Sequence, residues 1–143
     1  MSGIVVGVDD SPAAERALRW AVEEARLRGT ELHVISAWEF PFAPAAASGS
    51  DDDDLLPRVP SLEQSALEEL AEAVVKAGGK PEDEKVDVRV VHGSPPRVLL
   101  DAARNADLLV VGSRGRGGFT GLVLGSVSNV CVRRATCPVV VVR

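Results

Sequence analysis

Glycines, arginines and serines follow one apolar segment of the chain at a spacing that suits phosphate groups. Residues 108–111 are apolar, and they are followed by Gly112-Ser113-Arg114-Gly115-Arg116-Gly117-Gly118 and, further on, by Gly125-Ser126. Glycine lets backbone N–H groups approach phosphate oxygens closely, and a helix N-terminus offers unpaired N–H groups and the positive end of its dipole. Arginine side chains add positive charge. This segment therefore predicts a nucleotide-binding site.

Strand-like and helix-like segments alternate along the chain and would position these residues. Apolar or alternating runs predict strands at residues 4–8, 31–38, 86–91, 108–111 and 138–142. Apolar stripes at helical spacing predict one helix that starts at Ser11-Pro12, a second at Ser61, where a capping box begins, a third at Ser94-Pro95, and a fourth after Gly125. Residues 39–60 are rich in Pro, Ala, Ser, Gly and Asp, so we expect them to form a long flexible loop.

This alternation predicts an α/β fold in which helices flank a doubly wound sheet of five parallel strands. A chain of 143 residues favours a single domain, residues 1–143, with a core of its own. Ligands of such sheets bind beyond the carboxyl ends of the strands, where the strand order reverses. If the first and fourth strands are neighbours there, Asp9 and the segment that starts at Gly112 meet across one cleft.

Composition excludes several classes of partner. A net charge of −5 argues against a general nucleic-acid binder, which needs a broad basic face. No apolar run approaches the ~20 residues of a membrane span. The two cysteines, Cys131 and Cys137, form neither a disulfide framework nor a zinc-ligand set. Since no basic-then-apolar leader opens the sequence, we expect a cytoplasmic protein.

Three common phosphate-binding patterns do not fit the chain. The Walker loop requires a Gly-Lys-Ser/Thr ending, whereas Gly117 is followed by Gly118 and Phe119. The dinucleotide fingerprint and the flavodoxin type both use the loop after the first strand. That position holds Asp9 and Asp10, which would repel a pyrophosphate.

The spacing Gly112-x2-Gly115-x9-Gly125-Ser126 resembles the signature of the ATP-binding subgroup of the universal stress protein family. The resemblance covers the whole chain, including residues 4–11 at the start and 137–142 at the end. It implies a Rossmann-like sheet of order 3-2-1-4-5 and a homodimer. It also implies that Asp9 lies near the ribose and phosphates, that the backbone of Val34 meets the adenine, and that the signature residues line the ribose and phosphates.

We therefore expect ATP or another adenine nucleotide to be held, together with Mg²⁺, by Gly7, Asp9, Val34, Gly112, Ser113, Arg114, Gly115, Arg116, Gly117, Gly118, Gly125, Ser126 and Val127. Asp9 and Ser126 are the candidate Mg²⁺ ligands, because Mg²⁺ prefers oxygen. Structural alternatives stand beside these roles. Asp9 could cap the first helix, Gly125 could end a short apolar segment, and the arginines could be ordinary surface residues.

The chain shows no nucleophile–base pair, since neither histidine is linked in the sequence to a Ser or Cys. We expect a regulatory or sensor protein of the stress response and not an enzyme. A slow ATPase, a nucleotide-dependent enzyme, a cyclic AMP-binding protein and an interaction module with an empty pocket are the alternatives. Residues 139–142 are all valine, and in the implied order they form an edge strand, so we expect a homodimer through this strand.

Overall fold

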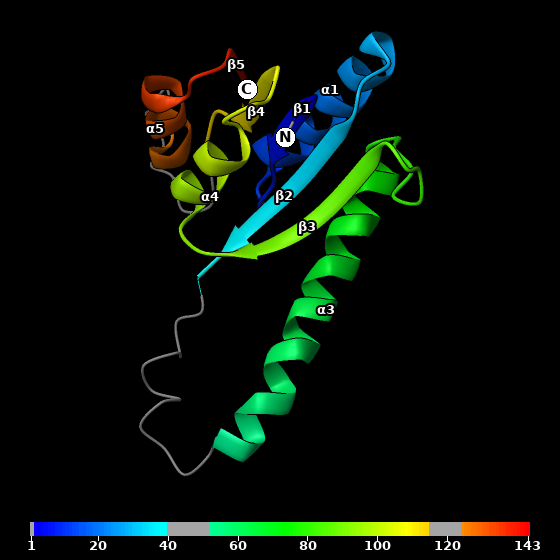
Figure 1. Ribbon diagram of the computed structural model, residues 1–143, viewed down its shortest axis with the longest axis vertical. Coiled ribbons are helices and arrows are strands. Elements are labelled where there is room, and N and C mark those ends of the chain that lie inside the picture. Colours follow the sequence, from blue (N-terminus) through cyan, green and yellow to red (C-terminus); the bar gives the residue numbers. More distant parts are fainter. Residues whose placement is uncertain (1, 40–51, 115–123) are drawn as a thin grey trace.

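The computed structural model describes residues 2–39, 52–114 and 124–143, and of residues 52–61 the backbone alone. Five parallel strands form one sheet in the order β3-β2-β1-β4-β5, which confirms the predicted fold (Figure 1). The strands are β1 (Ile4–Gly7), β2 (Leu32–Trp38), β3 (Val86–His92), β4 (Leu108–Gly112) and β5 (Val139–Val142). The helices of the described residues are α1 (Pro12–Arg28), α3 (Asp52–Lys76), α4 (Pro95–Ala102) and α5 (Ser126–Arg134).

Helices cover both faces of the sheet, and alternate residues of each strand enter two separate cores. On one face α1 and α3 pack on side chains such as Val6, Val34 and Val110. On the other face α4 and α5 pack on Val5, Ile35 and other residues of the opposite phase. Strands that are buried on both faces must be apolar at every position, which explains their continuous valine, leucine and isoleucine runs. None of the helices in the described ranges is long and apolar enough to span a membrane.

Helix α1 begins and ends where its sequence signals predict. The Ser11 hydroxyl accepts a hydrogen bond from the Ala14 N–H at 3.2 Å, and Pro12 occupies the first helical position, where no intrahelical N–H bond is lost. Gly29 ends the helix in the left-handed conformation, with φ of +64°. The start of α1 is therefore held firmly at the carboxyl end of β1.

Helix α3 corrects the prediction for residues 52–61. The helix begins at Asp52, so the capping box at Ser61 lies inside it and does not start it. The prolines at 57 and 60 favoured a loop, because each lacks an N–H for the helix. Two features act the other way: acidic residues 52–54 suit the positive end of a helix, and Leu55, Val59 and Leu62 continue the apolar stripe at helical spacing. Figure 1 shows the first turns of α3 extending past the carboxyl ends of β2 and β3.

Two glycines at strand ends let helices approach the sheet closely. A Cβ on Gly112, the last residue of β4, would lie 2.9 Å from the carbonyl carbon and 3.0 Å from the oxygen of Ala13 in α1. A Cβ on Gly7, the last residue of β1, would lie 2.5 Å from Cδ1 of Leu99 in α4. The first of these contacts is with backbone, which cannot rotate away. Helix α1 can therefore start beside β4 only if residue 112 has no side chain.

We predict that Gly112→Ala lowers the free energy of unfolding by about 1–3 kcal/mol, the usual cost of overpacking a tight contact. Urea denaturation of wild type and variant measures the difference. Gly7→Ala serves as the comparison, because there the added methyl meets a side chain, and its cost should shrink in a Leu99→Ala background. A Gly112→Ala protein as stable as wild type would show that α1 does not approach β4 this closely in solution.

Candidate functional site

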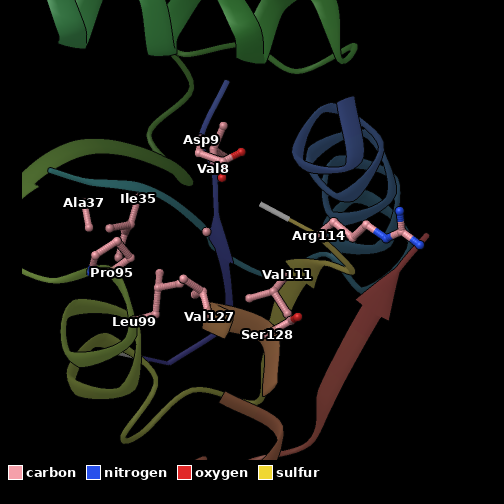
Figure 2. A pocket seen from close by; sticks show the side chains of 12 residues that line it. Val8, Asp9, Ile35, Ala37, Pro95, Leu99, Val111, Arg114, Val127 and Ser128 are labelled. Atoms are coloured by element: carbon pink, nitrogen blue, oxygen red, sulfur yellow. The ribbon is translucent and has the colours of Figure 1, made fainter. Parts of the chain in front are cut away.

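A pocket opens at the carboxyl ends of β1 and β4, where the strand order reverses. Its cavity volume is about 80 Å³, within a wider space of about 520 Å³ that includes open solvent. Its lining comes from β1, β2, β4, α4 and α5 and from the residues that follow β1 and β4: Gly7, Val8, Asp9, Ile35, Ala37, Pro95, Leu99, Val111, Gly112, Arg114, Val127 and Ser128 (Figure 2). This is the position at which doubly wound sheets bind their ligands. The pocket is therefore the candidate functional site.

One side of the pocket is apolar. Ile35 and Ala37 reach it from the end of β2, Pro95 and Leu99 from the first turns of α4, and Val127 from α5 (Figure 2). Ile35 and Leu99 are almost fully buried, with exposed fractions of 1% and 4%. Ala37, Pro95 and Val127 are half-buried and offer the accessible apolar surface, which can cover the flat face of an aromatic or heterocyclic ring.

The loop after β1 is bonded to the loop after β4 at the polar side of the pocket. The Asp9 carboxylate accepts a hydrogen bond from the Ser11 N–H at 2.9 Å, and the Ser11 hydroxyl lies 3.3 Å from the Arg114 carbonyl oxygen, to which it can donate. Asp9 is exposed and lines the pocket while it makes this turn. Asp9 thus holds Ser11, the residue that caps α1, and lies beside the pocket at the same time.

Helix α5 presents its N-terminus to the pocket. Gly125 is the N-cap, with φ of −75° and ψ of 173°, and its N–H donates to the Ser113 carbonyl oxygen at 2.6 Å. Intrahelical bonding begins with the Asn129 N–H, which donates to the Gly125 carbonyl oxygen at 3.0 Å. The N–H groups of the three preceding residues therefore have no acceptor within the helix. They and the helix dipole can interact with an anion at this point.

The structure brings most of the described sequence-predicted residues to this edge. Gly7, Asp9, Gly112, Arg114 and Val127 line the pocket. Ser113 and Gly125 are bonded to each other beside it, and Ser126 is the exposed first residue of α5. Figure 2 shows the Arg114 side chain pointing away from the apolar wall. Gly115, Arg116, Gly117 and Gly118 lie outside the described residues.

Val34 is not among the residues that line the pocket, and the expectation that its backbone meets an adenine stays a prediction. It lies in the middle of β2, fully buried, opposite Val6 on β1 and Val88 on β3, and its side chain belongs to the core under α1 and α3. The residues of β2 that reach the pocket are Ile35 and Ala37, which have the opposite phase and lie nearer the carboxyl end. Strand alternation explains which side chains of β2 reach the pocket, because the side chains of consecutive residues point to opposite faces of the sheet.

The sequence reasoning also missed Pro95, Leu99 and Ser128. Pro95 and Leu99 are one helical turn apart at the start of α4, so they share a face, and that face covers the end of β1. No residue type in this helix suggested a ligand. Ser128 was visible only as part of a serine-rich helix start, and its contacts depend on the path of the chain around Ser113.

Neither thiol offers a nucleophile at this edge. Both cysteines are free, and both belong to the core under α4 and α5. Burial raises the pKa of Cys131, which is fully buried, from 9.0 to about 11, and burial also raises the pKa of Cys137. Since the thiolate is the reactive form, burial makes both side chains less nucleophilic at neutral pH than a free thiol.

The buried histidine lies at the other end of the sheet. His33, near the start of β2, has one ring nitrogen 3.3 Å from Asp87 Oδ2 and the other 2.9 Å from the Ser2 carbonyl oxygen. These contacts attach the first residues of the chain to β2 and β3. Within the described ranges, no three His, Cys, Asp or Glu side chains gather as a metal site would require.

Comparison with known proteins identifies the family. The model of the universal stress protein family matches residues 1–143. The chain belongs to this family. A universal stress protein of Mycolicibacterium smegmatis is 40% identical over 143 residues, and one of Mycobacterium tuberculosis is 37% identical over 145; each alignment covers 98% of this chain and 45% of the relative. The chain thus spans about half the length of these curated relatives.

Solved structures of universal stress proteins share the fold. One from Lactobacillus plantarum is 23% identical with a TM-score of 0.73, covering 99% of this chain and 97% of its own. A universal stress protein in complex with cAMP is 28% identical, with a TM-score of 0.67 and coverage of 99% and 96%. One from Archaeoglobus fulgidus in complex with dAMP is 26% identical, with a TM-score of 0.63 and coverage of 100% and 98%.

The raised thiol pKa of Cys131 predicts a pH dependence. In a Cys137→Ser variant, iodoacetamide should label native Cys131 negligibly at pH 7 and increasingly as the pH approaches 11, while the urea-unfolded protein labels near pH 9. Because the pKa is higher in the folded state, the stability gained by burying the neutral thiol is full below about pH 9 and is lost as the pH rises through 11. Rapid labelling of the native variant at pH 7 would contradict this account.

Proposed function

We propose that this universal stress protein binds an adenine nucleotide, ATP with Mg²⁺, in the pocket between β1 and β4, and acts as a regulatory or sensor protein of the cytoplasm. The observation that carries the proposal is the juxtaposition of an apolar wall with the N-terminus of α5 in one pocket. A nucleotide matches these two surfaces, because the faces of its base are flat and largely apolar and its phosphates are anionic. The two free cysteines are consistent with a reducing compartment.

The apolar wall is the place for the base. Ile35, Ala37 and Leu99 would contact the faces of the adenine, and the ends of β1 and β2 would offer backbone groups to its edge. The backbone of Val34 stays in the proposed site as a contact of the adenine. The Leu99 side chain occupies the space where a Gly7 side chain would lie. Gly7 therefore contributes by letting α4 come close enough to form the apolar wall.

The phosphates would lie at the start of α5. Gly112 and Ser113 lead into the glycine- and arginine-rich segment, and Gly125, Ser126 and Val127 follow it. We extend the proposed site to Gly115, Arg116, Gly117 and Gly118 on their residue types alone. Arg114 is exposed and able to rotate toward an added phosphate chain.

The donors at this edge suit Mg²⁺. A carboxylate on Asp9, which lines the pocket, and a hydroxyl on Ser126, which is exposed at the first helical position, are oxygen ligands of the kind that Mg²⁺ prefers. Asp9 Oδ1 accepts the Ser11 N–H, and a carboxylate has further lone pairs to offer a cation. Mg²⁺ commonly bridges one or two such side chains and substrate phosphates, and it would neutralise part of the phosphate charge here.

Two structural relatives support adenine as the base, since one was solved with cAMP and another with dAMP. The cAMP complex makes a cyclic nucleotide the second candidate ligand. We propose regulation and not catalysis because the pocket lining holds no histidine and no cysteine, and Asp9 is the sole carboxylate among its described residues. Intact ATP recovered after hours with the protein would support this choice over a slow ATPase.

A negative charge introduced at residue 125 gives the sharpest test of where the phosphates bind. The backbone of Gly125 has a φ that any residue can adopt, and both Asp and Asn are good N-caps. Gly125→Asp should weaken ATP binding by at least roughly tenfold, because a carboxylate at the helix start repels phosphate, whereas the neutral Gly125→Asn of the same shape should lose much less. Calorimetry with ATP, AMP, cyclic AMP and adenosine in Mg²⁺ buffer measures the affinities.

The pattern across ligands decides the outcome. The loss in Gly125→Asp relative to Gly125→Asn should be largest for ATP and absent for adenosine. Equal affinities of the Gly125→Asp and Gly125→Asn variants for ATP would show that the phosphates do not lie at the start of α5. Wild-type protein that binds none of the four ligands would contradict the proposed function itself. A preference for cyclic AMP over ATP would favour the second candidate.

We also propose a homodimer through β5. This strand is at the edge of the sheet, and its four valines are half-buried. The Leu109 and Ser113 N–H groups donate to the Pro138 and Val142 carbonyls at 2.9 and 2.7 Å, so residues of this phase face β4. Those of the other phase, Val139 and Val141, point their backbone groups outward. Pairing with β5 of a second copy about a twofold axis would satisfy these groups and cover the valines.

The outward direction of the Val141 N–H predicts a clean test of the dimer. Val141→Pro removes a donor that faces away from β4, so the monomer fold should survive while dimerisation weakens strongly. Val141→Ala keeps the N–H and is the matched control, which should remain a dimer. Light scattering with sedimentation measures the masses. A folded proline variant that dimerises as well as wild type would place the interface elsewhere.

A further inference from the structure

One carbonyl oxygen holds both ends of the segment between β4 and α5. The Ser113 oxygen accepts the Gly125 N–H at 2.6 Å and the Ser128 hydroxyl at 3.0 Å. The same hydroxyl lies 3.1 Å from the Gly125 carbonyl oxygen. Residue 113, where the segment leaves β4, is therefore bonded directly to residue 125, where the segment enters α5, and Ser128 is bonded to both.

The Ser128 hydroxyl is placed to hold this junction without competition from solvent. Its residue is 2% exposed, and Ser113 is 8% exposed. A hydroxyl has a single proton, so at any moment it donates to Ser113 or to Gly125, and either bond keeps the start of α5 against the end of β4. Ser113 is fixed in turn on its other side, because its N–H donates to the Val142 carbonyl in β5 at 2.7 Å.

We infer that Ser128 is a positioning residue for the phosphate site. Its hydroxyl holds Ser113 and Gly125 together, and this sets where the free N–H groups of Ser126 and Val127 point. The inference rests on the proposed function, since it assigns those N–H groups to nucleotide phosphates. It adds a residue that lies outside the glycine–serine signature and that does not itself have to contact the ligand.

A local role within α5 does not account for the geometry. A serine at the third helical position often bonds the carbonyl three residues earlier, and Gly125 provides that carbonyl. The contact with Ser113, 15 residues away in sequence, belongs to no helix. Gly125 has no side chain with which to cap α5, and the Ser128 hydroxyl bonds to carbonyl oxygens, so the first N–H groups of α5 have no side-chain cap.

The test compares three variants with wild type: Ser128→Ala removes the hydroxyl, Ser128→Thr keeps it, and Ser94→Ala is the control. Ser94 is the N-cap of α4 at the same edge and makes no side-chain cap bond. In Ser128→Ala, affinity for ATP in Mg²⁺ should fall roughly 3- to 10-fold, the effect of one lost hydrogen bond, while affinity for adenosine stays within about twofold. Ser128→Thr should recover most of the loss, and Ser94→Ala should bind as wild type.

A second measurement is independent of any ligand. In the nucleotide-free protein, hydrogen exchange of the Gly125 amide should accelerate in Ser128→Ala and return toward the wild-type rate in Ser128→Thr. Unchanged exchange in Ser128→Ala would overturn the junction even if no nucleotide binds. Equal losses of ATP and adenosine affinity, together with a lower melting temperature, would reduce Ser128 to a general packing role. Wild-type protein that binds no nucleotide would defeat the proposed function, whereas faster exchange would still support the junction.

Discussion

The close approach of α1 to the end of β4 is the contact on which the functional edge depends. Gly112 makes room for the backbone of Ala13, and only because α1 starts there can the Ser11 hydroxyl reach the Arg114 carbonyl. That bond joins the loop after β1 to the loop after β4, although the two are far apart in the sequence. A side chain at residue 112 would separate the acidic turn at Asp9 from the helix start at α5. The pocket therefore depends on the absence of a side chain at residue 112 as well as on the residues that line it.

The two ends of the sheet are held by different chemistry. At the amino end, His33 and Asp87 tie the chain start to β2 and β3 through side chains, and the Gly3 N–H donates to Asp107 at 3.1 Å. At the carboxyl end, the described bonds that join the loops after β1 and β4 and the start of α5 run through backbone groups, serine hydroxyls and the Asp9 carboxylate. These short polar groups hold the loops together at the edge where the pocket opens.

Local signals carried most of the fold prediction. Continuous apolar runs identified all five strands to within one residue at most ends, and Ser11 with Pro12 located the start of α1. The start of α3 was wrong because Pro57 and Pro60 are loop signals locally, whereas the apolar stripe and the acidic first turn act over a longer range. The side chains of β2 that line the pocket, Ile35 and Ala37, have the opposite phase to Val34, and one residue in a strand is a change of face. Leu99 and Ser128 were beyond sequence reasoning, since their roles arise from contacts with Gly7 and Ser113 made only after folding.

Ser113 connects the proposed site to the proposed dimer strand. The Ser113 N–H donates to the Val142 carbonyl in β5, and the Ser113 carbonyl accepts from the Gly125 N–H and the Ser128 hydroxyl at the start of α5. The backbone of this one residue therefore links the edge strand to the helix start that is proposed to bind phosphate. Backbone bonds at 2.6 and 2.7 Å leave little freedom for one side to shift alone. A ligand that reorients α5 would therefore act on β5 through a single residue. Under the proposed function, Ser113 is the route by which a nucleotide held at the start of α5 would act on the proposed dimer strand.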